Sequence, residues 1–290
     1  MPKQNERREL PPDVPPPPIL YRFRTFGSNN AKDKEAVFEL LRGRLRFARL
    51  KDFNDPFEGR PAPVPAFADA GSQRAAVTKY LVQIQVDNGE SRGAARRRVA
   101  PFLHGKTPTQ VTKHLGRKIH DSLGSDELLV FSMCTEEAIT PPLAWAHYAD
   151  NHRGLCVHFD SSYLPFKFAQ RVEYAEEYPT VVFPRTYAHP FDPIRRGLLT
   201  KCHLWSYEHE YRLIKFFAED GISSNLHVKW HGNVAVAEAA AIKGVTLGAR
   251  MEVDTRRELS QWISEHVPSL EIWQADRHSS RYEITRERIR

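Results

Sequence analysis

The segment Trp205–Arg212 brings two acidic residues together with aromatic and basic ones. Its sequence, Trp-Ser-Tyr-Glu-His-Glu-Tyr-Arg, alternates in the way that is typical of a β-strand. Because successive side chains of a strand point to opposite faces, we expect Glu208 and Glu210 on one face, about 7 Å apart at roughly 3.3 Å per residue. Such a pair of acids suits ribose hydroxyls or a metal ion. The alternative is a solvated edge strand whose acids pair with Arg212 or with nearby lysines.

The segment Trp145–Gly154 is dense in indole, imidazole and phenol groups. Within it, His147 is a candidate base or hydrogen-bond donor. His147 and His152 are five residues apart, which is not the spacing that places two metal ligands on one helix face. A zinc site is therefore weakly supported. The alternative is a partly buried aromatic helix, because Trp145 and Tyr148 are three residues apart.

Two further segments carry polar groups beside aromatic ones. In Tyr21-Arg22-Phe23-Arg24, strand alternation puts both arginines on one face, where they either bind phosphate or carboxylate or simply face solvent. The segment Phe53–Glu58 (Phe-Asn-Asp-Pro-Phe-Glu) has the composition of an Asx turn with two aromatic anchors. We interpret it as a structural turn, and a binding role stays open.

The positive charge of the chain is concentrated in one window. The 290 residues include 42 Lys and Arg against 36 Asp and Glu, yet residues 91–120 contain eight Lys and Arg and no acid. Outside that window the chain is close to neutral. The residues expected to dock an acidic target are Arg92, Arg96, Arg97, Arg98, Lys113, Arg117 and Lys118. The alternative is a solvated pair of helices whose cations are neutralised by acids elsewhere.

Regular elements must position these residues, and the hydrophobic periodicity predicts an α+β fold with a mixed or antiparallel sheet and flanking helices. Strands are expected at 19–24, 45–50, 128–133, 155–159, 172–174, 207–217, 226–230, 234–237, 242–247 and 270–273, with a basic strand after them. Helices are expected at 32–42, within 72–120, from Pro142, near 192–202 and at 255–266. Residues 1–18 are expected to form a disordered, proline-rich leader. Residues 19–290 are expected to form one domain with a basic helical insertion at about 66–125.

Composition limits the compartment and the reaction class. The three cysteines are widely spaced, which predicts reduced core thiols in a cytoplasmic protein. No apolar run is long enough for a transmembrane helix, and the first residues lack the apolar stretch of a signal peptide, so we expect no membrane association. The glycine-rich and catalytic motifs of P-loop enzymes, kinases, serine hydrolases and zinc proteases are missing.

Five of these segments, in order, resemble bacterial domain-of-unknown-function family 2971 over residues 19–284. The matching segments are Leu20–Arg24, Phe53–Glu58, Trp145–Gly154 with Phe159, Trp205–Arg212 and Gly244–Arg250. The sequence departs from the family's pattern before the Phe53–Glu58 turn, where Ala48 stands in place of a small hydroxyl residue. The family's name conveys no activity.

The chain is also similar in outline to ADP-ribosyltransferase-like folds, which combine an early strand Arg, a middle hydroxyl residue and a late catalytic Glu. This resemblance implies that Glu210, with Glu208 and His147, is catalytic. It implies NAD as the cofactor, and no metal is expected. The residues expected to bind NAD are Tyr21, Arg22, Arg24, Ser132, Trp145 and Tyr148.

The sequence therefore predicts an NAD-dependent ADP-ribosyltransferase-like enzyme that modifies a protein or a nucleic acid, in a bacterial defence or toxin setting. One alternative is a metal-dependent nuclease or phosphodiester hydrolase with Asp55, Glu58, His147, Glu208 and Glu210 at its site. The other is a non-catalytic module that binds nucleic acid, or an acidic protein, through the basic insertion.

Overall fold

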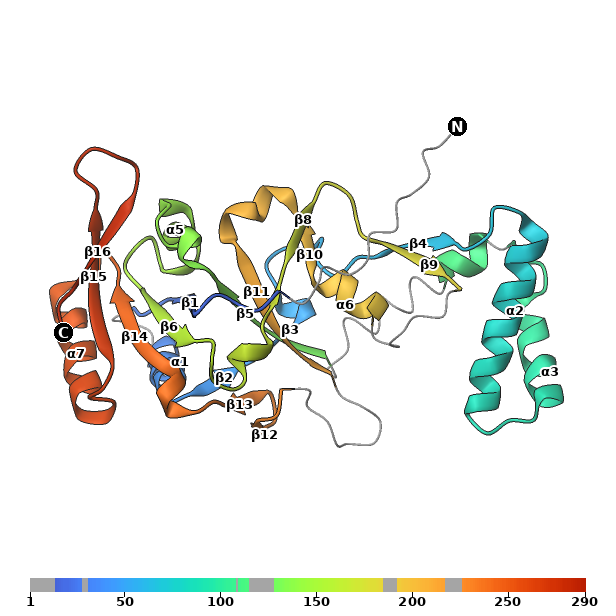
Figure 1. The fold of residues 1–290 in the computed structure, drawn as a ribbon, viewed down its shortest axis with the longest axis horizontal. Coiled ribbons are helices and arrows are strands. Elements are labelled where there is room, and N and C mark those ends of the chain that lie inside the picture. The colour runs from blue at the N-terminus through green and yellow to red at the C-terminus, as the bar shows by residue number, and fades with distance from the viewer. Residues whose placement is uncertain (1–13, 28–30, 108, 115–127, 185–191, 217–225) are drawn as a thin grey trace. The chain divides into compact units, whose positions relative to one another are not determined.

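The computed structural model of the protein describes residues 14–27, 31–107, 109–114, 128–184, 192–216 and 226–290 (Figure 1). It combines helices with a mixed sheet, so the α+β class expected from the sequence is confirmed. The chain divides into two compact units. Unit 1 consists of Met1–Asn54, Asp126–Tyr174 and His203–Arg290, and unit 2 of Asp55–Ser125 and Ala175–Cys202. Of the leader expected at 1–18, residues 1–13 lie outside the described residues, and residues 14–18 contain no helix or strand.

Unit 1 is built on a nine-stranded sheet. Its strands are β1 (Ile19–Arg24), β3 (Ala48–Arg49), β5 (Leu128–Cys134), β6 (Leu155–Asp160), β7 (Gln170–Arg171), β11 (Glu210–Phe216), β14 (Ile242–Leu247), β15 (Glu271–Arg277) and β16 (Ile284–Arg288). The order is β16-β15-β14-β6-β1-β5-β11-β7, and β3 also pairs with β5. All pairs are antiparallel except β14 with β15, which are parallel and are joined by helix α7 (Val253–His266).

The central strand β1 pairs unequally with its two neighbours. With β6 it forms a regular ladder, in which Ile19 through Arg24 oppose Asp160 through Leu155. With β5 it pairs at one register position, Tyr21 opposite Cys134. The sheet is therefore continuous from β16 to β1 and from β5 to β7, and is joined at the centre by a short contact.

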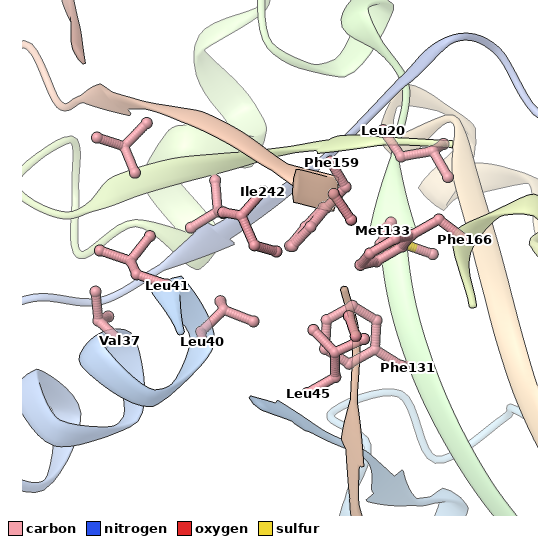
Figure 2. Close-up of a cluster of buried hydrophobic side chains, with 14 of the residues drawn as sticks. Leu20, Val37, Leu40, Leu41, Leu45, Phe131, Met133, Phe159, Phe166 and Ile242 are labelled. Carbon is pink, nitrogen blue, oxygen red and sulfur yellow. The ribbon is translucent and has the colours of Figure 1, made fainter. Parts of the chain in front are cut away.

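One face of the sheet carries the larger core. Strand alternation directs Leu20, Phe131 and Phe159 to this face, where α1 (Ala31–Leu41) and α7 pack. In Figure 2, Val37, Leu40 and Leu41 of α1 point toward Ile242 and the strand residues. Helices α1 and α7 were both expected, because each presents its apolar residues at helical spacing. These side chains are buried in the larger core.

The opposite face carries a smaller core and the polar groups of the candidate site. Tyr21 and Phe23 lie on this face and pack with Trp145 of α5 (Pro142–Tyr148). Pro142 begins α5, as expected, because its missing N–H is tolerated in the first turn. Helix α5 is thereby fixed on the sheet by its apolar side.

The remaining elements of unit 1 are short. They are the three-stranded sheet β12 (Lys229–His231), β13 (Val234–Val236) and β2 (Arg44–Arg46), the 3₁₀ helices η1 (Leu50–Asp52), η2 (Glu136–Ala138), η3 (Phe166–Phe168), η4 (His203–Glu208) and η5 (Ala239–Ala241), and strand β8 (Glu173–Ala175) at the unit boundary. Strand β11 begins at Glu210, so the strand expected from Tyr207 is shorter than predicted.

Unit 2 has a core of its own. Its elements are α2 (Ala70–Asp87), α3 (Arg92–Leu103), a helical segment at 109–114, β4 (Ala62–Pro65), β9 (Thr180–Phe183), α6 (Asp192–Leu198) and β10 (Thr200–Cys202). Helices α2 and α3 lie side by side (Figure 1), and β4 pairs in parallel with β9. The helix expected near 192–202 ends at Leu198. The expected insertion at 66–125 belongs, where it is described, to this unit.

Within the described ranges, no helix combines the length and the apolar character that crossing a bilayer requires. All three cysteines are free, as expected: Cys134 and Cys156 are buried, and Cys202 is partly exposed. Cys134 and Cys156 lie on the same sheet face as Tyr21 and Phe23, because they oppose these residues in the β1 ladders.

Candidate active site

A row of polar side chains crosses the face of the sheet on which α5 packs. The ladder registers align His158 of β6 with Tyr21 of β1, Tyr21 with Cys134 of β5, and Cys134 with Glu210 of β11. Because neighbouring strands are about 4.8 Å apart, Tyr21 and Glu210 stand about 10 Å from each other across Cys134. The sheet therefore brings together residues that are far apart in the sequence.

The segment Glu208–Glu210 is not the continuous strand that its alternation predicts. Glu208 is the last residue of η4, and His209 has a φ of +43°. The His209 N–H donates to Ser206 O at 3.2 Å, and its carbonyl accepts from Thr135 N–H at 3.2 Å. This left-handed residue breaks the alternation, so the expectation of two acids on one strand face was wrong. The solvation expected in the alternative was also wrong, because Glu208 and Glu210 are 6% and 5% exposed, but the pairing with Arg212 is confirmed for Glu210.

Glu210 is held in an ion pair with Arg212 on the same strand. Arg212 Nε and Nη2 donate to the two carboxylate oxygens at 2.7 and 2.9 Å, and Arg212 is fully buried. The Arg212 guanidinium also lies 5.4 Å from the centre of the Phe53 ring. Ser132 opposes Arg212 in the ladder and shares its face. A buried, bidentate pair of this kind neutralises both charges, so Glu210 is part of the scaffold of the site.

Glu208 has a different environment. The Tyr148 hydroxyl of α5 donates a hydrogen bond to its carboxylate. On the preceding residue of α5, His147 Nδ1 lies 2.9 Å from the Tyr207 hydroxyl of η4. Two neighbouring residues of α5 thus contact η4. Tyr148 contacts the Glu208 carboxylate, and His147 contacts the Tyr207 hydroxyl.

Aromatic rings surround this contact at the surface. The ring centre of His147 lies 6.0 Å from those of Tyr148 and Tyr207 and 6.3 Å from that of Trp205. His147 is exposed, and Trp205 and Tyr207 are partly exposed. Edge-to-face contacts at these distances are favourable. The Tyr148 ring, whose hydroxyl binds Glu208, therefore belongs to a group of aromatic rings that are at least partly accessible.

Trp145 does not have the role expected for it. It is fully buried, its Nε1 donates to Ile139 O at 2.8 Å, and its ring contacts Phe23 edge-on at 4.9 Å. A cofactor cannot stack on a ring that the core encloses, so the expectation that Trp145 binds a cofactor was wrong. The partly exposed indole that contacts His147 is that of Trp205.

Arg22 lies on the other face of the sheet. Its guanidinium stands 4.1 Å from the centre of the Phe131 ring, and Nη1 donates to Ser132 O. Burial and the neighbouring Arg24 lower the pKa of Arg22 to about 9, so it still carries its charge at neutral pH. Burial also lowers the pKa of Arg24, whose Nε is buried without a hydrogen-bond partner. The structure thus brings Arg22 to the backbone of Ser132, where the charge of Glu210 partly offsets the lowering of its pKa.

A cation that the sequence did not single out lies on the site's face. Arg286 of β16 forms an ion pair with Glu136 of η2 and donates through Nη2 to the Tyr21 hydroxyl at 3.3 Å. Tyr21 in turn donates to Glu136 at 3.4 Å, and burial raises the pKa of Tyr21. No motif surrounds Arg286 in the sequence, so only the strand order reveals its position.

Where the structure describes them, the histidine and the acids of the metal-dependent alternative form no group that could hold a metal ion. Asp55 and Glu58 belong to unit 2, where Asp55 Oδ1 accepts from Phe57 N–H at 2.9 Å in the expected Asx turn, and Glu58 pairs with Lys201 at 3.2 Å. His152 stacks on Trp145, away from the side chain of His147. Among the described residues, no three His, Cys, Asp or Glu side chains are grouped so that they could hold a metal ion.

The expected docking residues belong to unit 2. Arg92, Arg96, Arg97 and Arg98 lie on α3 and Lys113 in the helical segment at 109–114, and all five are exposed. Arg117 and Lys118 lie outside the described residues. The described part of the basic window thus consists of two helical segments joined at 104–107 by a turn.

Comparison with models of protein families, with the curated proteins and with the solved structures gave no match. The resemblances to domain-of-unknown-function family 2971 and to ADP-ribosyltransferase-like folds therefore stay predictions. The function has to be inferred from the site itself, whose centre is Glu208 with its aromatic neighbours.

Proposed function

We propose that the protein is an enzyme that cleaves the N-glycosidic bond of NAD and transfers the ADP-ribose to a macromolecular target. The observation that carries this proposal is the Glu208 carboxylate, which is buried and bound by the Tyr148 hydroxyl, next to His147, whose ring contacts those of Trp205 and Tyr207. A negative charge beside accessible rings suits a planar, cationic group such as nicotinamide on its ribose.

The reaction needs few groups from the protein. The bond between ribose C1′ and the nicotinamide nitrogen breaks, and nicotinamide leaves with the electron pair. The positive charge that develops on the ribose is stabilised by the Glu208 carboxylate, which is already desolvated and oriented by Tyr148. A nucleophile of the target then bonds to C1′ and loses its proton to Glu208 or to water.

This proposal moves the catalytic role from Glu210 to Glu208. Glu210 is paired on both oxygens with Arg212, so it holds the strand and the site in place. The proposal also assigns the binding of the pyrophosphate to Arg286 in place of Arg22. Arg286 is on the same sheet face as Glu210, and its side chain is 21% exposed. Arginine binds phosphate oxygens in a bidentate manner, which suits this role.

The test is nicotinamide release from NAD by the purified protein. We expect E208Q to reduce the release at least 100-fold while the melting temperature stays close to that of the wild type. The matched control is E137Q, because Glu137 is an exposed acid on η2 in the same unit. The proposal is wrong if the wild type releases no nicotinamide with any target preparation, or if E208Q and E137Q are equally active.

A further inference from the structure

Unit 2 carries the whole net charge of the protein. Its residues include 15 Lys and Arg against 9 Asp and Glu, whereas unit 1 has 27 of each. The excess of +6 therefore belongs to the smaller unit and not to the unit that holds Glu208. A charge difference of this size between two parts of one chain points to separate partners for the two parts.

Helix α3 is held firmly within unit 2. Ala95, Val99 and Leu103 recur every four residues and are buried against α2, where Val77 and Val82 complete the contact. The Ser91 side chain accepts from Ala94 N–H at the start of the helix. At its end, Arg74 of α2 donates to Leu103 O at 3.0 Å. The exposed side of α3, opposite this contact, is thus held in a fixed orientation within unit 2.

That surface carries cations without acidic partners. Helix α3 contains no acid, and in the described part of the chain Arg92, Arg96, Arg97 and Lys113 form no ion pair. Arg92 donates only to the neutral Gln83, at 3.4 Å. Arg98 differs, because it pairs with Glu90. Among the described cations of α3 and of the segment 109–114, neutralisation by an acid, the alternative stated from the sequence, is therefore seen for Arg98 alone.

We infer that the exposed side of α3 binds the phosphate backbone of a nucleic-acid duplex. Consecutive residues of a helix point about 100° apart, so Arg96 and Arg97 can contact phosphates that lie apart on a broad surface. A duplex offers such a surface, with one negative charge per roughly 1.7 Å. Guanidinium groups match phosphate oxygens in geometry as well as in charge.

The composition of this side of α3 favours a duplex over a single strand. Single strands are bound by stacking their bases on aromatic rings, and the exposed residues of α3 include none. Gly93 and Ala100 are exposed near Arg97. Because both residues are small, a duplex can approach the helix closely there. A duplex held by its phosphates alone is bound without sequence preference.

This inference does not depend on the proposed chemistry, because binding by unit 2 and NAD cleavage in unit 1 are measured separately. The probe is a labelled DNA duplex of about 20 base pairs, titrated with the full-length protein at several salt concentrations. Four phosphate contacts predict a slope of about −3.6 for log K against log salt, which is a loss of roughly 100-fold in affinity between 50 and 200 mM.

The decisive variant is R96Q/R97Q, for which we expect the magnitude of the slope to fall by about 1.8. The matched control is R257Q/R277Q, which removes the same charge from two exposed positions of unit 1 and should keep the wild-type slope. The variant E208Q should bind the duplex as the wild type does, whether or not it cleaves NAD.

Three results would overturn the inference. The first is an equal loss of affinity in R96Q/R97Q and R257Q/R277Q, which would mean that only total charge matters. The second is equal binding of single-stranded DNA of the same sequence. The third is competition by polyglutamate at the same concentration of charges, which would indicate an acidic protein as the partner.

Discussion

The hydroxyl of Tyr148 donates a hydrogen bond to the buried carboxylate of Glu208, and this contact joins α5 to η4. The elements that carry the two residues are both held in place. Trp145 anchors α5 in the core, and His209, which has a left-handed conformation, follows the last residue of η4. The contact therefore helps to set the direction of the Glu208 carboxylate. Several measurable properties depend on it.

Removing the Tyr148 hydroxyl should impair the reaction more than the fold. A hydrogen bond to a charged group contributes about 1.5–3 kcal/mol, so we expect Y148F to lower kcat for nicotinamide release about 10- to 100-fold. Tyr178→Phe makes the same chemical change at an exposed tyrosine of unit 2 and should be neutral. Equal rates for the two variants would contradict the role given to Tyr148.

The ion pair of Glu210 and Arg212 should stabilise the folded protein. E210Q leaves the fully buried guanidinium of Arg212 without its counter-charge, and we expect the free energy of unfolding to fall by about 3–5 kcal/mol. The double variant E210Q/R212M should lose less, because it also removes the stranded charge. Denaturant titration of the three proteins measures this. A loss below about 1 kcal/mol for E210Q would show that the pair is not the scaffold we describe.

His158 should make the fold sensitive to acid. It is 5% exposed and its Nε2 lies 2.8 Å from Thr246 Oγ1, and burial lowers its pKa to about 3. The unfolded chain binds a proton at this residue below about pH 6.5, whereas the folded chain does not until about pH 3. The stabilising contribution is thus fully present above pH 6.5 and is lost as the pH falls toward 3, by roughly 3 kcal/mol at pH 4.

The measurement is the stability of the wild type and of His158→Gln between pH 7 and pH 4. Carboxylates elsewhere titrate in both proteins, so the difference between the two curves isolates His158. We expect the wild type to lose its stability relative to the variant as the pH falls. Parallel curves would mean that His158 is not excluded from protonation in the folded state.

Gly154 should tolerate no side chain. A Cβ at this position would stand 2.2 Å from the carbonyl oxygen of Arg24, at the end of β1. We expect Gly154→Ala to lower the stability by about 3 kcal/mol, because backbone atoms would have to shift. Gly27→Ala is the control, since a Cβ there meets nothing within 4 Å. Thermal unfolding of both variants tests this, and equal melting temperatures would contradict it.

Much of the fold follows from periodicity. The strands at 19–24, 128–133 and 155–159 and the helices at 32–42 and 255–266 were predicted and are confirmed, because each has a continuous apolar face. Periodicity does not carry the order of the strands. That β1 lies between β5 and β6 depends on contacts between residues more than 100 positions apart, which no local pattern encodes.

The site was predicted in part. The motifs selected Glu208, His147 and Tyr148, and the structure places these three together. The different environments of Glu208 and Glu210 were not predictable, because they depend on the left-handed φ of His209 and on the burial of Arg212. Arg286 could not be found either, since its neighbours in space are distant in the sequence.

The place of β1 at the centre of the sheet also has a consequence for synthesis. Asp160, the ladder partner of Ile19, follows it about 140 residues later, and Cys134, the β5 partner of Tyr21, follows Tyr21 about 110 residues later. At roughly 5–20 residues per second, β1 waits on the order of ten to thirty seconds for β6, and somewhat less for β5. Until β5 is made, the apolar residues of β1 have neither of their partner strands, so the nascent chain exposes a β-strand that only much later segments cover.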